Sequence, residues 1–222
     1  MKTFDKLNVC ACLMICCLSA FGKIGHAENC IRGSGFGMSE ERHFTAFDTI
    51  DIAGAYNVAI NYGSEQMFKI TGDDNILPHI ITRVKQRTLF IYTNRPICTA
   101  NDITIKINTG LLKSLIATGA GDIEMNDVQN KSLSVRTAGA IDMKLTGRTD
   151  SLDVVLAGAG DFDAQKLKTE NSRISITGAG DTILYASQSL TVQLDGAGDL
   201  TCYGNPAKVS KKISGVGDIL IK

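Results

Sequence analysis

Apolar and polar residues alternate along the second half of the chain with a period of two, which is typical of β-strands. A tetrapeptide of the form Gly-x-x-Asp interrupts this alternation at regular intervals. Its six copies begin at Gly119, Gly139, Gly158, Gly178, Gly196 and Gly215, at intervals of 20, 19, 20, 18 and 19 residues. Each repeat therefore predicts a strand, a glycine-rich corner, a second strand and a polar turn.

The aligned repeats place apolar residues at equivalent positions. One repeat cannot bury its apolar face alone, but stacked repeats can, because equivalent residues then form columns along the stack. We therefore predict an all-β, single-domain parallel β-solenoid, similar to a β-helix, with coils of about 19 residues. The position one residue after the aspartate carries Ile123, Met143, Phe162, Thr182, Leu200 and Ile219, and the position four residues before the glycine carries Leu115, Val135, Val154, Ile174, Val192 and Lys211.

The preceding part of the domain has the same strand pattern but is less regular. Gly54-Ala55 resembles a degenerate first corner, and the segment 77–85, which contains Pro78, is compatible with a strand or one short helix. Residues 28–46 are glycine-rich and polar, which predicts a loose N-terminal arm before a solenoid domain over 47–222. Further strands are expected at Val58–Ile60, Met67–Ile70, Thr88–Tyr92 and Ile103–Ile107.

The N-terminus has the pattern of a signal peptide over residues 1–27. Lys2 and Lys6 precede an apolar run, and Gly25-His26-Ala27 is a small-x-small cleavage site. A retained membrane anchor is the alternative, whereas a lipid anchor is disfavoured because Val9-Cys10-Ala11-Cys12 precedes the apolar run. We expect an exported protein, located in the periplasm or at the outer cell surface, without a membrane span after cleavage.

The composition narrows the classes of partner. The chain has 23 basic and 23 acidic residues, so a basic surface for nucleic acid or anionic membrane is not expected. There is no tryptophan, so Ile, Leu, Val and Ala must fill the interior. No motif for a cofactor is found.

Three of the seven cysteines lie beyond the signal peptide: Cys30, Cys98 and Cys202. In an oxidising compartment they allow one disulfide and one free thiol. We predict the pair Cys30–Cys98, because Cys202 falls on an inward-facing position. Three widely separated cysteines form no metal-binding motif.

Several segments resemble one protein family. Phe47–Ile50, Asn57–Asn61, Thr88–Ile91 and the serial Gly-Ala-Gly-Asp corners are similar to the GIN domain, known as a "putative" autotransporter adhesin head domain and as a domain of unknown function. The resemblance covers about residues 47–222 and implies a β-solenoid-like fold and a role in adhesion. It implies no catalytic residues. Ile141 departs from the motif, which has glycine at that position.

The aspartates of the corners are the first candidate site. Stacked carboxylates repel one another unless backbone N–H groups, solvent or cations offset their charge. We favour corner caps that accept backbone N–H bonds, as in Asx turns, over a ladder of cations such as Ca²⁺. The first glycine of each corner is expected to permit positive φ. The aspartates are Asp122, Asp142, Asp161, Asp181, Asp199 and Asp218.

A second candidate is an outward-facing column that carries Glu124, Lys144 and Asp163. The two carboxylates would lie two rungs apart, ~9.6 Å, at the upper limit of the ~6.5–9.5 Å used by inverting glycosidases. This leaves a carbohydrate-active solenoid enzyme, a polysaccharide hydrolase or lyase, as the alternative function. His43 and His79 belong to no nucleophile motif, and we predict no catalytic residue.

The favoured function is a non-catalytic binding or structural module, adhesin-like at the cell surface, with a protein or glycan ligand at the envelope. The last predicted strand, Ile219–Lys222, has an open edge that could pair with another chain. We therefore expect a homo-oligomer through the C-terminal strand edge.

Overall fold

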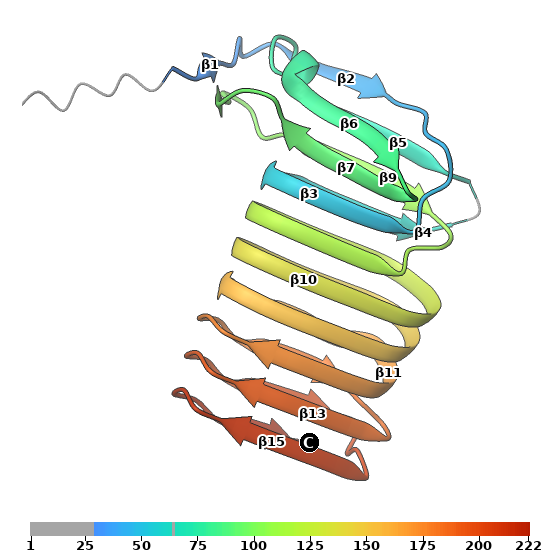
Figure 1. The fold of residues 1–222 in the computed structure, drawn as a ribbon, viewed down its shortest axis with the longest axis vertical. Helices are drawn as coiled ribbons and strands as arrows, with labels where there is room; N and C mark the ends of the chain where they lie inside the picture. Colours follow the sequence, from blue (N-terminus) through green and yellow to red (C-terminus); the bar gives the residue numbers. More distant parts are fainter. Residues whose placement is uncertain (1–28, 64) are drawn as a thin grey trace, which may run out of the picture.

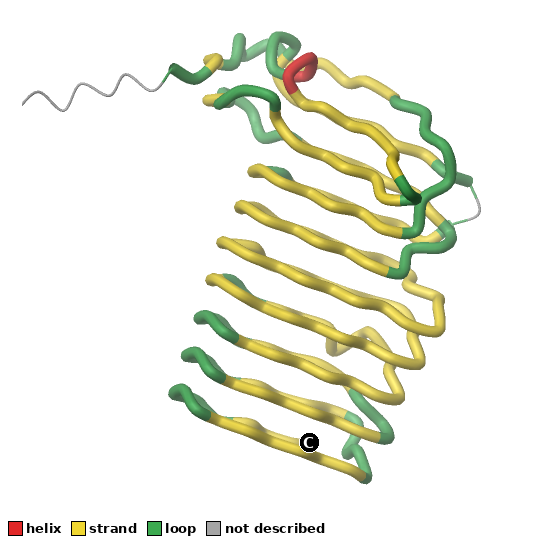
Figure 2. Tube along the Cα trace, viewed as in Figure 1, coloured by secondary structure: helices red, strands yellow, loops and turns green. Residues whose placement is uncertain are grey.

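Strands account for nearly all regular structure in the computed structural model, which describes residues 29–63 and 65–222 (Figures 1 and 2). The one helical element of these residues is a 3-10 turn, η1 (Leu77–His79). None of the described helical structure is long and apolar enough to cross a membrane. The signal peptide predicted for residues 1–27 lies outside the described residues.

The repeats form a ladder of parallel strands along the long axis of the molecule (Figure 1). The residues one position after each aspartate pair in register between neighbouring rungs. These successive partners are Met143, Phe162, Thr182, Leu200 and Ile219. The prediction of an all-β chain built largely on parallel pairing is thereby confirmed. The strands are β10 (Ser114–Ala159), β11 (Phe162–Ile176), β12 (Thr182–Tyr185), β13 (Ser189–Leu194), β14 (Leu200–Tyr203), β15 (Lys208–Ile213) and β16 (Ile219–Ile221).

The corners separate the strands of the ladder into two rows. Strands before the corners stack in the order β7, β3, β10, β11, β13 and β15, and strands after them in the order β9, β4, β10, β11, β12, β14 and β16. The long strands β10 and β11 contribute to both rows. Side chains that face inward from the two rows form one apolar cluster, because alternate residues of each strand point to the same face.

The N-terminal strands continue this ladder and then reverse direction. Gly54-Ala55 aligns with Gly119-Ala120, as expected of a degenerate corner. Segment 77–85 contains both η1 and a strand that turns back on its neighbour. The antiparallel pairs are β5 with β9 and β6 with β7, and the bounds are β3 (Thr49–Ala55), β4 (Asn57–Tyr62), β5 (Met67–Asp73), β6 (Ile80–Lys85), β7 (Thr88–Thr93) and β9 (Thr104–Thr109).

The segment 28–46, expected to be a loose arm, is held by strand pairing where it is described. β1 (Ile31–Arg32) pairs in parallel with β8 (Ile97–Cys98), and β2 (Gly37–Glu41) pairs antiparallel with β5. Glycine and polar residues suggested a loop, but the partners of β2 lie 28 to 36 residues further along the chain. Local composition carries no signal for such non-local pairing.

Candidate functional site: the aspartate corners

The corner glycines meet two structural requirements, positive φ and close approach of the previous rung, and the third position of the motif meets both. The third position has positive φ in five corners, from 125° at Gly121 to 147° at Gly217. At the first position, φ is positive at Gly119, Gly139 and Gly158, so the expectation of positive φ holds for three corners and not for Gly178, Gly196 and Gly215. At all six first positions a Cβ atom would overlap a carbonyl oxygen of the corner one rung earlier. The first glycine is therefore required mainly for close approach of stacked corners.

The corner aspartates connect successive rungs. Oδ1 of Asp142 accepts a hydrogen bond from the backbone N–H of Asp161 (2.8 Å), and Oδ1 of Asp161 accepts one from Asp181 N–H (2.8 Å). The pattern continues from Asp181 to Asp199 N–H (3.1 Å) and from Asp199 to Asp218 N–H (2.9 Å). Each of these four carboxylates thus accepts its hydrogen bond from the next rung. In the expected Asx turn, the donor would instead belong to the turn of the same aspartate. Because a charged acceptor strengthens a hydrogen bond, these contacts offset part of the repulsion between neighbouring aspartates.

The ladder begins at a residue that the sequence analysis did not name. Asn57 occupies the fourth position of the degenerate corner, and its Oδ1 accepts a hydrogen bond from Asp122 N–H (3.3 Å). Alignment of Gly54-Ala55 with the later corners would have found it. Within the described residues, no such bond joins Asp122 to the amide of Asp142, in the corner where Ile141 replaces glycine.

The aspartates form a file of exposed carboxylates without a cage of oxygen ligands. Across residues 29–63 and 65–222, no three His, Cys, Asp or Glu side chains lie close enough together to hold a metal ion. Side chains alone therefore provide no Ca²⁺ site of the usual six to eight oxygens.

The second candidate column lies beside this file. Lys144 pairs in register with Asp163, and Glu124 lies on the same side of the preceding rung. No ion pair joins the three side chains in the part of the chain that the structure describes, and Asp163 Oδ1 accepts from Gln165 N–H (3.0 Å). A shallow depression of about 250 Å³ opens here, lined by Asp122, Ile123, Glu124, Asp142, Met143, Lys144 and Asp161.

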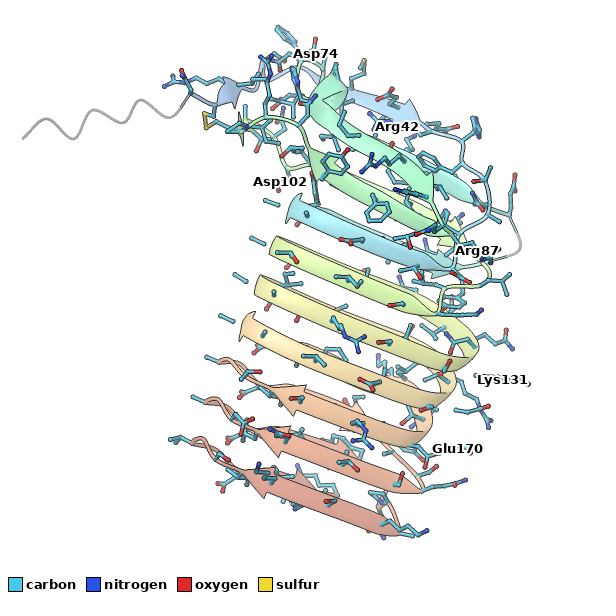
Figure 3. The ribbon with its side chains drawn as sticks, in the orientation of Figure 1. Arg42, Asp74, Arg87, Asp102, Lys131 and Glu170 are labelled. Atoms are coloured by element: carbon cyan, nitrogen blue, oxygen red, sulfur yellow. A yellow bond between two sulfur atoms is a disulfide. The ribbon has the colours of Figure 1, made fainter. Side chains whose placement is uncertain are left out.

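A buried carboxylate at the N-terminal end was not foreseen either. Asp73 accepts hydrogen bonds from Gly35 N–H (3.1 Å), Ala100 N–H (2.9 Å) and the backbone and side chain of Asn101 (3.3 and 2.6 Å). Burial alone raises the pKa of Asp73, but the hydrogen bonds from Ala100, Asn101 and Gly35 lower it below its usual value. The neighbouring Asp74 and Asp102, at the same end of the molecule, are labelled in Figure 3.

A covalent bond also joins the segment before Gly35 to the segment before Ala100. Cys30 and Cys98 form a disulfide, with their Cα atoms 5.6 Å apart. Cys202 is a free, fully buried thiol, and burial raises its pKa to about 11. His79 Nδ1 lies 3.1 Å from Asn94 Oδ1, and His43 is exposed.

The parallel ladder defines the class of protein: over residues 29–63 and 65–222 it is an all-β protein with a large, mostly parallel sheet. A family model described as "Putative auto-transporter adhesin, head GIN domain" matches residues 46–206, and the chain belongs to this family. The resemblance noted from the sequence is thereby confirmed. No match to a curated protein was found.

Solved structures show the same fold. A "putative adhesin" from Bacteroides fragilis superposes with a TM-score of 0.73 at 23% identity, covering 86% of this chain and 100% of its own. A "putative adhesin" from Parabacteroides merdae gives a TM-score of 0.51 at 19% identity, covering 86% of this chain and 98% of its own. At such identities the likeness concerns the fold.

Proposed function

We propose that this chain is an exported, non-catalytic binding and structural module that acts as an adhesin at the cell surface. Its scaffold is a β-solenoid with coils of about 19 residues. Membership of a family described by adhesion supports this function. The periplasm is the alternative location for the same module.

The ladder of corners is the observation that carries the proposal. An exposed carboxylate recurs at each rung, ~4.8 Å from the next, and each is held by a hydrogen bond to the following rung between Asp142 and Asp218. A rigid file of like groups suits a ligand that is itself repetitive, because many weak contacts then add without a large ordering cost. A protein or glycan of the cell envelope, or of a host surface, is such a ligand.

Protease accessibility tests the location. Intact cells and lysed cells are treated with the same protease, and the protein is followed with an antibody. Cleavage on intact cells is expected from an adhesin. Protection until lysis would place the module in the periplasm and would overturn the adhesin proposal.

Binding to glycan and protein arrays tests the ladder itself. Asp161→Asn keeps the oxygen that accepts the Asp181 amide and removes the charge, whereas Lys131→Ala changes an exposed side chain away from the corners. If the carboxylates contact the ligand, Asp161→Asn combined with Asp181→Asn weakens binding at least about tenfold, and Lys131→Ala leaves it unchanged. Equal binding by all variants would exclude the ladder as the contact surface.

A carbohydrate-active enzyme is the second candidate, because Glu124 and Lys144 line a shallow depression and Asp163 pairs in register with Lys144. Polymer breakdown by the unmutated protein, abolished by Glu124→Gln or Asp163→Asn, would support it. Absence of breakdown across common polysaccharides would end this candidate.

A further inference from the structure

The two ends of the ladder are both open strand edges. In the described part of the chain, β16 and β15 have partners on one side only, as does β2 at the opposite end. The apolar side chains that stay exposed also gather there: of the seven large ones among the described residues, six lie at these two ends. They are Phe36 and Met38 near β2, and Val209, Ile213, Val216 and Leu220 in the last rung.

The last rung exposes the end of the core and carries positive charge. All six residues of β15 are exposed, and three of them are lysines, with no acidic residue among them. Lys211 pairs in register with the buried Val192, so its side chain takes an inward-facing position at the end of the core. Its Nζ donates to the Ile219 carbonyl (2.9 Å).

The opposite end carries acidic side chains. β2 contains Glu40 and Glu41 and no basic residue. Glu40 pairs in register with the buried Ile70, so it too takes an inward-facing position at the end of the core, where its carboxylate accepts a hydrogen bond from Arg42 Nη2 (2.7 Å). A Lys211 ammonium from another copy would therefore join an existing ion pair. Among the described residues, β6 also has a partner on one side only, and Arg42 donates to the carbonyl of Ile80 (2.6 Å) at its start. Because β6 is antiparallel to β7, it cannot continue the parallel row to which β7 belongs, whereas β2 can extend the other row.

The strand directions at the two ends also match. β2 is antiparallel to β5, and β5 is antiparallel to β9, so β2 runs in the same direction as β9 and β4. These strands are parallel to the row that ends in β16. A second copy in the same orientation can therefore place its β2 beside β16 and continue the parallel ladder.

We propose that copies of this chain associate head to tail, with β16 of one molecule pairing with β2 of the next. The contact joins two unpaired edges, covers apolar side chains at both ends and brings the inward ammonium of Lys211 toward the inward carboxylate of Glu40. Because the two surfaces differ, the contact is heterologous and extends into an open chain of molecules. This inference concerns assembly and does not depend on the ligand proposed above.

The mass of the protein, purified after export from a bacterial host, is measured by light scattering and sedimentation over a range of concentrations. We expect the average mass to rise continuously with concentration. Lys211→Glu and Glu40→Lys should each weaken association at least about tenfold, because like charges then face each other. An equimolar mixture of the two variants should recover assembly, since each supplies the end that the other lacks. Lys131→Glu, with the same change of charge away from both ends, should associate normally.

Three outcomes would overturn the proposal. The first is a protein that stays monomeric up to its solubility limit. The second is undiminished association of Glu40→Lys alone, which would indicate pairing of two C-terminal edges. The third is a Lys131→Glu variant that loses association as much as Lys211→Glu. Val209→Asp, at an exposed position, gives a second C-terminal variant if Lys211→Glu fails to fold, and we expect the same loss of association from it.

Discussion

The C-terminal ladder and the N-terminal end of this molecule share strands but differ in how they are held together. From Ser114 onward, each rung repeats the previous one, and glycines and aspartates form the same contacts at nearly every corner. At the N-terminal end the strands reverse direction, and single contacts such as the Cys30–Cys98 disulfide and the Asp73 cluster join distant segments. We therefore expect the stability of the ladder to depend most on backbone conformation at the corners. The stability of the N-terminal end should depend most on its disulfide and on the charge of Asp73.

The largest expected effect comes from a corner glycine. Gly180 has a φ of 135°, and a Cβ atom there would overlap the carbonyl oxygen of Gly160. Gly180→Val should reduce the free energy of unfolding by about 4 kcal/mol, from backbone strain and overpacking combined. Urea unfolding measures it. The control is Gly37→Ala in β2, where a Cβ atom has nothing within 4 Å, with an expected change below about 1 kcal/mol. Equal losses would refute the distinction between the two regions.

The disulfide should give the next largest effect, confined to the N-terminal end. Cys30 and Cys98 close a loop with a sequence separation of 68 residues. Cys30→Ser with Cys98→Ser should lower the stability of this end by about 2–4 kcal/mol. Hydrogen exchange resolves the two regions, and we expect faster exchange in β1, β2 and β8 with little change in β12 to β16. Uniformly faster exchange would show that the chain unfolds as one unit.

Acid should also loosen the N-terminal end first. The pKa of Asp73 is lowered in the folded protein, so its ionised form stabilises the fold above the pKa of the unfolded chain, about 3.9. This contribution is lost as the pH falls from about 4 through the lowered folded value. Exchange at Gly35 and Ala100 should rise over that range, and Asp73→Asn should make the rise smaller. An unchanged pH profile in Asp73→Asn would contradict the assignment.

The smallest effect should come from one aspartate of the ladder. Asp161→Ala removes the acceptor of the Asp181 amide and should cost about 1 kcal/mol, whereas Asp161→Asn keeps an acceptor and should be nearly neutral. Asn57 already has this role in the first corner. Thermal unfolding measures both, and Asp122→Ala, which removes no bond to the following aspartate amide, is the matched control. A loss in Asp161→Asn equal to that in Asp161→Ala would show that charge, not hydrogen bonding, matters at the corner.

The sequence was sufficient for the features that repeat. The inward columns around Phe162 and Leu184 and the place of each corner followed from a period of two and an interval of 18–20 residues. Features that occur once were not predictable in the same way. The hydrogen bonds of Asp73 and the pairing of β2 with β5 join residues that share no sequence pattern. Asn57 was missed because Tyr56 stands in the corner where most of the later corners have glycine. The direction of the aspartate hydrogen bonds, between rungs rather than within a turn, depends on backbone geometry that residue identity does not encode.

The hydrogen bond from one corner aspartate to the next has a consequence for the evolution of this family. Each corner contacts only the one before it and the one after it, so a whole coil can be duplicated or deleted without creating a new kind of contact. Each such event would change the length of the molecule by ~4.8 Å and leave both ends intact. Selection can thus change the length of the molecule one coil at a time, while the chemistry of its surface stays the same.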